Sequence, residues 1–128
     1  MISHDPIADL LTIIRNATDR LVVCKHSTFK ASICQFLKDN GYIESFSTEH
    51  SGKRKFLAIT LKYYQSKKCI ERIQRVSKPS CRVYANASSI PKYFSGLGVY
   101  CVSTNQGMMT DKEARTNNLG GELIFTVC

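Results

Sequence analysis

The sequence predicts a mixed α/β (α+β) fold built from two small packed subdomains, residues 1–65 and 66–128. Helical and strand patterns interleave in the first half, and polar residues interrupt them between Tyr64 and Lys68. The second half is mostly β in pattern, with one short helix. A chain of 128 residues is long enough to bury a core. The first subdomain should run helix, strand, helix, hairpin.

The first predicted helix spans Asp5 to Asn16. Asp5 suits the N-cap and proline at position 6 the first helical position, and an amphipathic apolar stripe follows, made of Ile7, Leu10, Leu11 and Ile14. Arg15 and Asn16 come at its C-terminal end. A cation there complements the helix dipole, and it also suits a surface that faces phosphate. The two interpretations are compatible.

A short strand over Leu21–Cys24 should precede a second helix. Ser27-Thr28 supply hydroxyls that can cap this helix, which runs from about Phe29 to Asn40 and ends at Gly41. Two strands, Tyr42–Phe46 and Phe56–Leu61, then form a hairpin. Its basic edge, Lys53-Arg54-Lys55, could touch RNA, but a solvated hairpin tip is the more frequent meaning of such a run.

The next stretch is less regular. Because Ile70, Ile73 and Val76 recur every three residues, periodicity does not distinguish helix from strand there. A turn, a strand, and a helical turn or bend should follow, over Ser77–Ser80, Cys81–Tyr84 and Ser89–Lys92. Gly96 and Gly98 permit close backbone passage before the last segment.

The closing segment, Gly98 to Cys128, reads as strand, polar loop, short helix, tight turn and strand. Thr110 and Glu113 fit a capping box, and Asn118 with Gly120-Gly121 offers left-handed positions that end the helix. The loop from Ser103 to Gly107 carries hydroxyls and amides that could hydrogen-bond phosphates, riboses or bases. An ordinary polar surface turn is the alternative.

Composition points to a folded chain with a polyanionic partner. Hydrophobic residues make up 43% and charged residues 22%, as in globular proteins. The net charge is +8 and the pI is near 9.3, which favours nucleic acid. Residues 65–128 carry a net +5 and residues 1–64 a net +3. We expect no membrane span and no leader.

The six cysteines show no C-x-x-C pair, so we expect mostly buried structural thiols rather than a zinc site, a disulfide or a catalytic thiol. No metal or cofactor is expected. Asp111, Glu113 and Glu122 form the only titratable cluster beside the loop, without a matching base and nucleophile, which argues against an enzyme. A protein-binding scaffold with incidental basicity is a third class, and it predicts salt-insensitive RNA binding or none.

Several segments together resemble a known family. They are Asp5-Pro6-Ile7-Ala8-Asp9, Arg15-Asn16-Ala17, Ile70 to Ser77 with Lys78-Pro79, Arg82-Val83-Tyr84, Ile90-Pro91-Lys92, Gly96-Leu97-Gly98, Val102-Ser103-Thr104, Gly107, Met109-Thr110-Asp111, Ala114-Arg115 and Leu119-Gly120-Gly121-Glu122. They span the chain in order, and the closing set is highly specific. The chain resembles a bacterial-type member of the family of small-subunit ribosomal protein number eight.

The resemblance implies a two-part α/β protein that binds the central domain of small-subunit ribosomal RNA and contacts neighbouring ribosomal proteins. Bacterial members also bind their own operon's messenger RNA and repress its translation, which is the alternative function. The implied location is the ribosome, in the cytoplasm or in an organelle matrix or stroma. The implied RNA-contacting residues fall into two sets: Ser103, Thr104, Asn105, Gln106, Glu122, Tyr84 and Lys92; and, for a second contact, Arg15, Asn16, Ser27 and Lys30.

Two departures from the family pattern remove charge from the expected RNA face. The loop continues Asn105-Gln106-Gly107 where the family usually has Ser-Lys-Gly, and Ala85-Asn86-Ala87 stands where basic residues are frequent. Hydrogen-bonding capacity is kept while cations are lost. The departures suggest that the rest of the ribosome contributes more of the anchoring.

Overall fold

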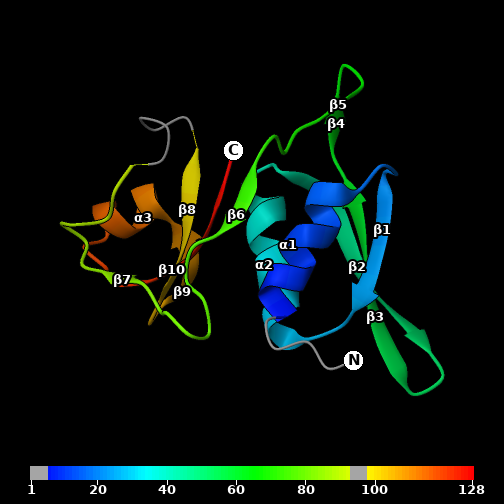
Figure 1. Ribbon diagram of the computed structural model, residues 1–128, viewed down its shortest axis with the longest axis horizontal. Helices are drawn as coiled ribbons and strands as arrows, with labels where there is room; N and C mark the ends of the chain where they lie inside the picture. The colour runs from blue at the N-terminus through cyan, green and yellow to red at the C-terminus, as the bar shows by residue number, and fades with distance from the viewer. Residues whose placement is uncertain (1–5, 93–97) are drawn as a thin grey trace. The chain divides into compact units, whose positions relative to one another are not determined.

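A computed structural model describes residues 6–92 and 98–128 of the chain. It forms two compact units, Pro6–Glu71 and Arg72–Cys128 (Figure 1). Both units combine helices with antiparallel sheets, so the predicted α+β class is confirmed. The predicted subdomain boundary lay earlier, between residues 65 and 66. The expected Asp5 cap and the passage at Gly96 lie outside the described residues.

The first unit is a three-stranded antiparallel sheet with two helices packed on one face (Figure 1). Its main elements are α1 (Pro6–Asn16), β1 (Leu21–Lys25), α2 (Thr28–Asp39), β2 (Ile43–Ser51) and β3 (Arg54–Leu61), with strand order β1-β3-β2. The predicted helix, strand, helix and hairpin are confirmed, and both hairpin strands are longer than expected.

Alternation along β3 explains how this unit forms its core. Leu57, Ile59 and Leu61 are buried, while the residues between them are partly exposed on the other face. The α2 helix begins where the Ser27 hydroxyl accepts a hydrogen bond from the Lys30 N–H at 3.1 Å, as the capping pattern predicts. It ends before Gly41, whose φ of +79° favours glycine.

The polar stretch that interrupts the sequence pattern is a small hairpin of the first unit. Its strands are β4 (Tyr63–Tyr64) and β5 (Lys67–Lys68), which pair antiparallel. Between them Gln65 and Ser66 both have positive φ, 51° and 66°. The Lys68 ammonium donates to backbone carbonyls at the end of α1, which fastens the hairpin to that helix.

The second unit is built on a five-stranded antiparallel sheet and one short helix. Its elements are β6 (Ile73–Arg75), β7 (Tyr84–Ala85), β8 (Val99–Thr104), β9 (Gly107–Thr110), α3 (Asp111–Thr116) and β10 (Gly121–Val127). The path is β6-β10-β8-β9, and β7 also pairs with β10. A buried cluster of Ile90, Val102, Ala114 and Leu123 lies between sheet and helix.

Two local predictions differ from this structure, and a third segment, left open between helix and strand, is a strand. The ambiguous stretch after Ile70 contains a strand, β6, because it pairs with β10. The expected strand Cys81–Tyr84 is reduced to Tyr84–Ala85, since Cys81 forms only an isolated bridge with Lys78. The expected helical bend at Ser89–Lys92 is a turn that closes at Ser89, where its N–H donates to the Asn86 carbonyl.

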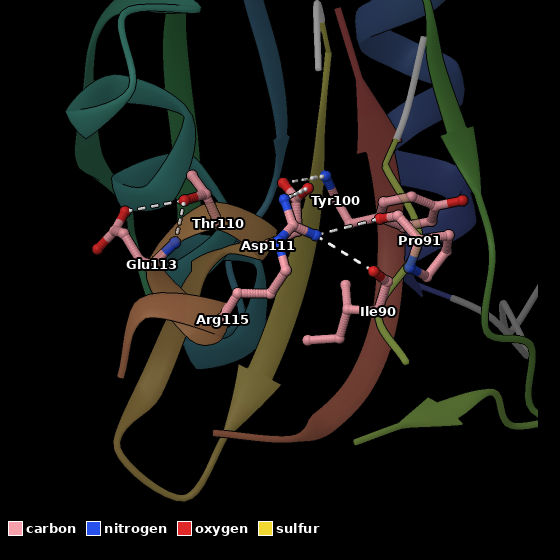
Figure 2. A network of polar contacts seen from close by, with 7 residues as sticks. All are labelled: Ile90, Pro91, Tyr100, Thr110, Asp111, Glu113 and Arg115. Carbon is pink, nitrogen blue, oxygen red and sulfur yellow. Dashed lines mark hydrogen bonds and ion pairs between the residues drawn. The ribbon is translucent and has the colours of Figure 1, made fainter. Parts of the chain in front are cut away.

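An ion pair with a buried carboxylate positions α3 in the second unit (Figure 2). The Asp111 carboxylate, fully buried, lies 2.8 Å from the Arg115 guanidinium and accepts from the Tyr100 N–H at 3.2 Å. Arg115 also donates to the carbonyls of Ile90 and Pro91. One carboxylate and one guanidinium therefore connect β8, α3 and the chain before residue 92.

The ends of α3 follow the predicted signals in part. The Thr110 oxygen accepts from the Glu113 N–H at 3.2 Å, as predicted, but the Glu113 carboxylate accepts from the Thr110 hydroxyl instead of its N–H. Asn118 has a left-handed φ of 56°, and the Leu119 N–H donates to the Ala114 carbonyl. Gly120 and Gly121 do not have positive φ, so their expected left-handed role is wrong.

The cysteines are less buried than predicted. Cys24, Cys34 and Cys101 are buried, but Cys69 and Cys128 are partly exposed and Cys81 is exposed. Burial raises the pKa of the Cys34 thiol to about 12 and also raises the pKa of Cys101. A thiol held protonated in this way is a poor nucleophile.

Asp111→Ala should destabilise the protein strongly, because it leaves the Arg115 guanidinium and the Tyr100 N–H without their partner. Removing one member of a fully buried pair costs about 3–5 kcal/mol, and because the Arg115 side chain is 25% exposed we expect the lower end of that range. Thr110→Ala, which removes only the cap, should cost about 1 kcal/mol. Chemical denaturation measures both, with the exposed Thr116→Ala as control. Equal losses for Asp111→Ala and Thr116→Ala would contradict the assigned role.

Thiol labelling at neutral pH should modify Cys81 first and leave Cys24, Cys34 and Cys101 protected until the protein unfolds. Since folding raises the pKa of Cys34 from 9.0 to about 12, the unfolded state ionises first. The free energy of unfolding should therefore fall as the pH rises above about 9. Mass spectrometry of labelled peptides and denaturation at pH 7 to 10 test this. Fast labelling of Cys34 in the native protein is the contrary result.

Candidate nucleic-acid interface

Three of the predicted RNA-binding residues lie in one row across the second sheet. Glu122 of β10 is paired with Ser103 of β8 on one side and with Tyr84 of β7 on the other. Directly paired residues of antiparallel strands point to the same face. Their sequence neighbours Val102 and Leu123 are buried in the core of the unit. The row Tyr84-Glu122-Ser103 therefore lies on the outer face of the sheet.

The predicted polar loop is a tight hairpin instead. Ser103 and Thr104 are the last residues of β8, and Asn105 and Gln106 alone make the exposed turn into β9. The Thr104 hydroxyl accepts from the Gln106 N–H at 3.1 Å and donates to the Gly107 carbonyl at 2.8 Å. Within the described residues, the Ser103 hydroxyl has no such partner. Thr104 thus shapes the turn, and Ser103 presents its hydroxyl beside it.

Glu122 has partners within its own unit. Its carboxylate accepts from the Ser77 hydroxyl and lies 3.2 Å from the Arg82 guanidinium. The Ser77 oxygen in turn accepts from the Val83 N–H at 3.1 Å, which connects the residue before β7 to this group. Ser77 and Arg82 were missed as members of the site, because nothing in the sequence pairs Glu122 with residues 45 and 40 positions away.

Two glycines allow the backbones of the row to approach closely. A Cβ atom on Gly121 would lie 2.2 Å from the Ser103 carbonyl oxygen, and one on Gly120 would lie 2.7 Å from that of Ala85. Beside them is an open hollow of about 320 Å³, lined by Tyr84, Ala85, Asn86, Ser89, Gly120 and Gly121. Tyr84, at the edge of this hollow, is 69% exposed. A flat group could enter here and contact both backbone and ring.

Lys92 lies in the same unit on an exposed segment. The two residues before it, Ile90 and Pro91, are held by their carbonyl bonds to Arg115 (Figure 2). Lys92 itself is exposed. The cation is therefore presented to solvent from a chain segment whose position depends on α3.

The four predicted residues of the first unit are not brought together. Arg15 and Asn16 are exposed at the C-terminal end of α1, whereas Ser27 and Lys30 lie at the start of α2. The strand β1 runs between these two ends, and five extended residues span roughly 16 Å. Figure 1 shows the two helix ends at opposite ends of the unit. A single contact through all four would have to extend along the unit.

Ser27 and Lys30 also contribute to the fold. The Ser27 oxygen caps α2, and the Lys30 ammonium donates to the Lys25 carbonyl at 3.3 Å. Lys30 is only 9% exposed. Their RNA contact stays a prediction, and Lys30 offers little of its surface for it.

The acidic residues beside the site are engaged in structural contacts. Asp111 is paired with Arg115, Glu113 accepts from Thr110, and Glu122 is paired with Arg82. Among the described residues, no group of three or more histidine, cysteine or acidic side chains is placed to hold a metal ion. No helix in the described part of the chain is long and apolar enough to cross a membrane.

Comparison with known proteins agrees with the resemblance found in the sequence. The family Ribosomal protein S8 matches residues 5–128. Proteins named small ribosomal subunit protein uS8 from Cupriavidus metallidurans and Bordetella avium are each 50% identical over 130 residues. That from Laribacter hongkongensis is 48% identical, and each comparison covers 99% of both chains. The chain therefore belongs to the ribosomal protein S8 family.

Proposed function

We propose that this chain is a structural, non-catalytic protein of the small ribosomal subunit that binds ribosomal RNA, with its second unit as the specific contact. Membership of the S8 family and the net charge of +8 support this function. The observation that carries the choice of surface is the row Tyr84-Glu122-Ser103, which lies beside an exposed amide turn and an open hollow.

The chemistry of this surface suits distorted RNA. A-form RNA hides its major groove, so proteins read its shallow minor groove, its riboses and its unpaired bases. A short hydroxyl such as that of Ser103 and the amides of Asn105 and Gln106 can reach these groups. Basic side chains elsewhere supply affinity through phosphate contacts. We infer that the ligand is an irregular helix of the central domain, and that neighbouring small-subunit proteins are further partners.

The operon's own messenger RNA is a second ligand that the same surface could hold. A face that reads shape through hydroxyls and amides accepts any RNA with the same distorted element. Regulation of translation would then use the residues of the ribosomal contact. Competition between the two RNAs for the purified protein tests this, because separate surfaces would allow both to bind at once.

Ser103→Ala should weaken binding to a central-domain transcript by roughly 1–3 kcal/mol, because RNA groups buried against it lose their partner. No counterion is involved, so the salt dependence should not change. Discrimination between the cognate element and a regular duplex should shrink. Filter-binding or fluorescence titrations with both RNAs measure these effects.

Ser47→Ala, an exposed serine change in β2 of the first unit, is the matched control. Thr104→Val is not an equivalent test, since it also removes two hydrogen bonds of the turn. If a folded Ser103→Ala protein bound both RNAs as the wild type does, the row would lose its role in specificity.

Arg15→Ala should lower RNA affinity and reduce the slope of log affinity against log salt by about one, with little change in RNA preference. The reason is that a protein with one phosphate contact less releases fewer counterions from the RNA when it binds. Lys38→Ala, which removes an exposed cation from α2, is the control and should leave the slope unchanged. A wild-type slope near zero would instead favour a protein-binding scaffold with incidental charge.

A further inference from the structure

The β4–β5 hairpin presents an aromatic ring to solvent. Tyr64 is 70% exposed, and its cross-strand partner Lys67 is exposed beside it. Paired positions of an antiparallel ladder share a face, so ring and ammonium lie on the same side of the hairpin. Figure 1 shows the hairpin projecting beyond the three-stranded sheet of its unit.

The hairpin is anchored to the end of α1 by a lysine side chain. The Lys68 ammonium lies 2.9 Å from the Ala17 carbonyl oxygen, 3.0 Å from that of Arg15 and 3.4 Å from that of Ile14. A cation at the C-terminal end of a helix is also favoured by the helix dipole. The Cys69 N–H continues the ladder by donating to the Lys62 carbonyl at 2.9 Å. Tyr64 and Lys67 are therefore presented in a defined place.

The turn of the hairpin adopts a backbone that its residues disfavour. Gln65 and Ser66 both have positive φ, the conformation of a type I′ turn, which asparagine and glycine normally occupy. Left-handed backbone at other residues is costly, and it persists where surrounding contacts require it. Here the Lys68 anchor and the strand pairing supply those contacts.

The anchor also places the hairpin beside residues already proposed to contact RNA. Lys68 bonds to the last turn of α1, which carries Arg15 and Asn16 at the surface. The hairpin segment, residues 62–68, contains three lysines and no acidic residue. Lysine is depleted from protein–protein interfaces, whereas an aromatic ring with nearby cations is the usual means of holding single-stranded nucleic acid.

We propose that the β4–β5 hairpin is a further RNA-binding site, in which Tyr64 stacks on an unpaired nucleobase and Lys67 binds a phosphate of an adjacent nucleotide. The site extends the contact of Arg15 and Asn16, so it rests on the proposed function. Lys68 is its positioning residue, because its ammonium is directed at carbonyls of the same chain and orients the hairpin. Base stacking on tyrosine is tolerant of sequence, so the site adds affinity with little base preference.

Substitution of Tyr64 tests the stacking contact in the full-length protein with a transcript of the small-subunit ribosomal RNA central domain. Tyr64→Ala should weaken binding by roughly 5- to 150-fold, the range for loss of one stacked base. Tyr64→Phe should bind like the wild type, whereas Tyr64→Leu should bind like the alanine variant. Val23→Ala is the control, since Val23 is 56% exposed in the same unit outside the hairpin.

A fluorescent reporter makes the test independent of affinity. The chain has no tryptophan, so Tyr64→Trp introduces a single indole at the site. RNA should quench its emission and protect it from acrylamide, while the indole of Val23→Trp should stay accessible. Lys67→Gln should reduce the salt slope by about one. Adding Lys68→Met to the Tyr64→Trp variant should reduce the quenching, and Lys68→Arg should preserve it.

The outcomes separate this site from the proposed function. If wild-type protein does not bind the transcript, the proposed function fails and the hairpin site fails with it. If the wild type binds, but Tyr64→Ala binds within twofold of it and the indole of Tyr64→Trp stays accessible, only the hairpin site is refuted. Protection of that indole by other small-subunit proteins without RNA would likewise overturn the proposal, because the hairpin would then be a protein contact.

Discussion

The arrangement of the second unit depends on the ion pair between the buried Asp111 carboxylate and the partly exposed Arg115 guanidinium. The carboxylate holds the start of β8 through the Tyr100 N–H, and the guanidinium holds the carbonyls of Ile90 and Pro91. Since β9 leads directly into α3 at Thr110, the pair also fixes one end of the β8–β9 hairpin. Buried ion pairs often add little net stability compared with apolar residues, but they require one geometry. The main effect of the Asp111–Arg115 pair is to set the positions of the β8–β9 hairpin and of the chain before Lys92.

The candidate RNA-contacting surfaces of the two units differ in their chemistry. Around the row Tyr84-Glu122-Ser103, the carboxylate neutralises Arg82, and the turn offers amides rather than a cation. The exposed end of the first unit combines Arg15 with the lysines of the β4–β5 hairpin. Phosphate contacts give affinity without sequence information, whereas hydroxyl and amide contacts report shape. Under the proposed function, we infer that the row of the second unit reads RNA shape and that the exposed end of the first unit contributes phosphate contacts.

The features that sequence predicted correctly are those whose cause lies within a few residues. Ser27, Thr110 and Asn118 act on backbone groups three or four positions away, so the limits of α2 and α3 were readable. The strands β4, β5 and β9 were missed, because such short strands form only through their partners. The contacts of Glu122 with Ser77 and Arg82 join distant segments, and so do the close approaches of Gly120 and Gly121. The candidate RNA face was identified by the family resemblance and, for the Ser103–Gly107 loop, by residue type, but its geometry depends on these long-range contacts.

Ser103 and Thr104 show how neighbouring hydroxyls acquire different roles. Successive residues of a strand point to opposite faces, so Ser103 joins Glu122 on the outer face while Thr104 lies on the side of Val102. Thr104 is the last residue of β8. Its hydroxyl hydrogen-bonds to the backbone of the turn that follows, at Gln106 and Gly107. The turn is thereby closed by a side chain rather than by glycine alone. One hydroxyl shapes the hairpin and leaves the other, with the exposed amides of Asn105 and Gln106, at the surface proposed to meet RNA.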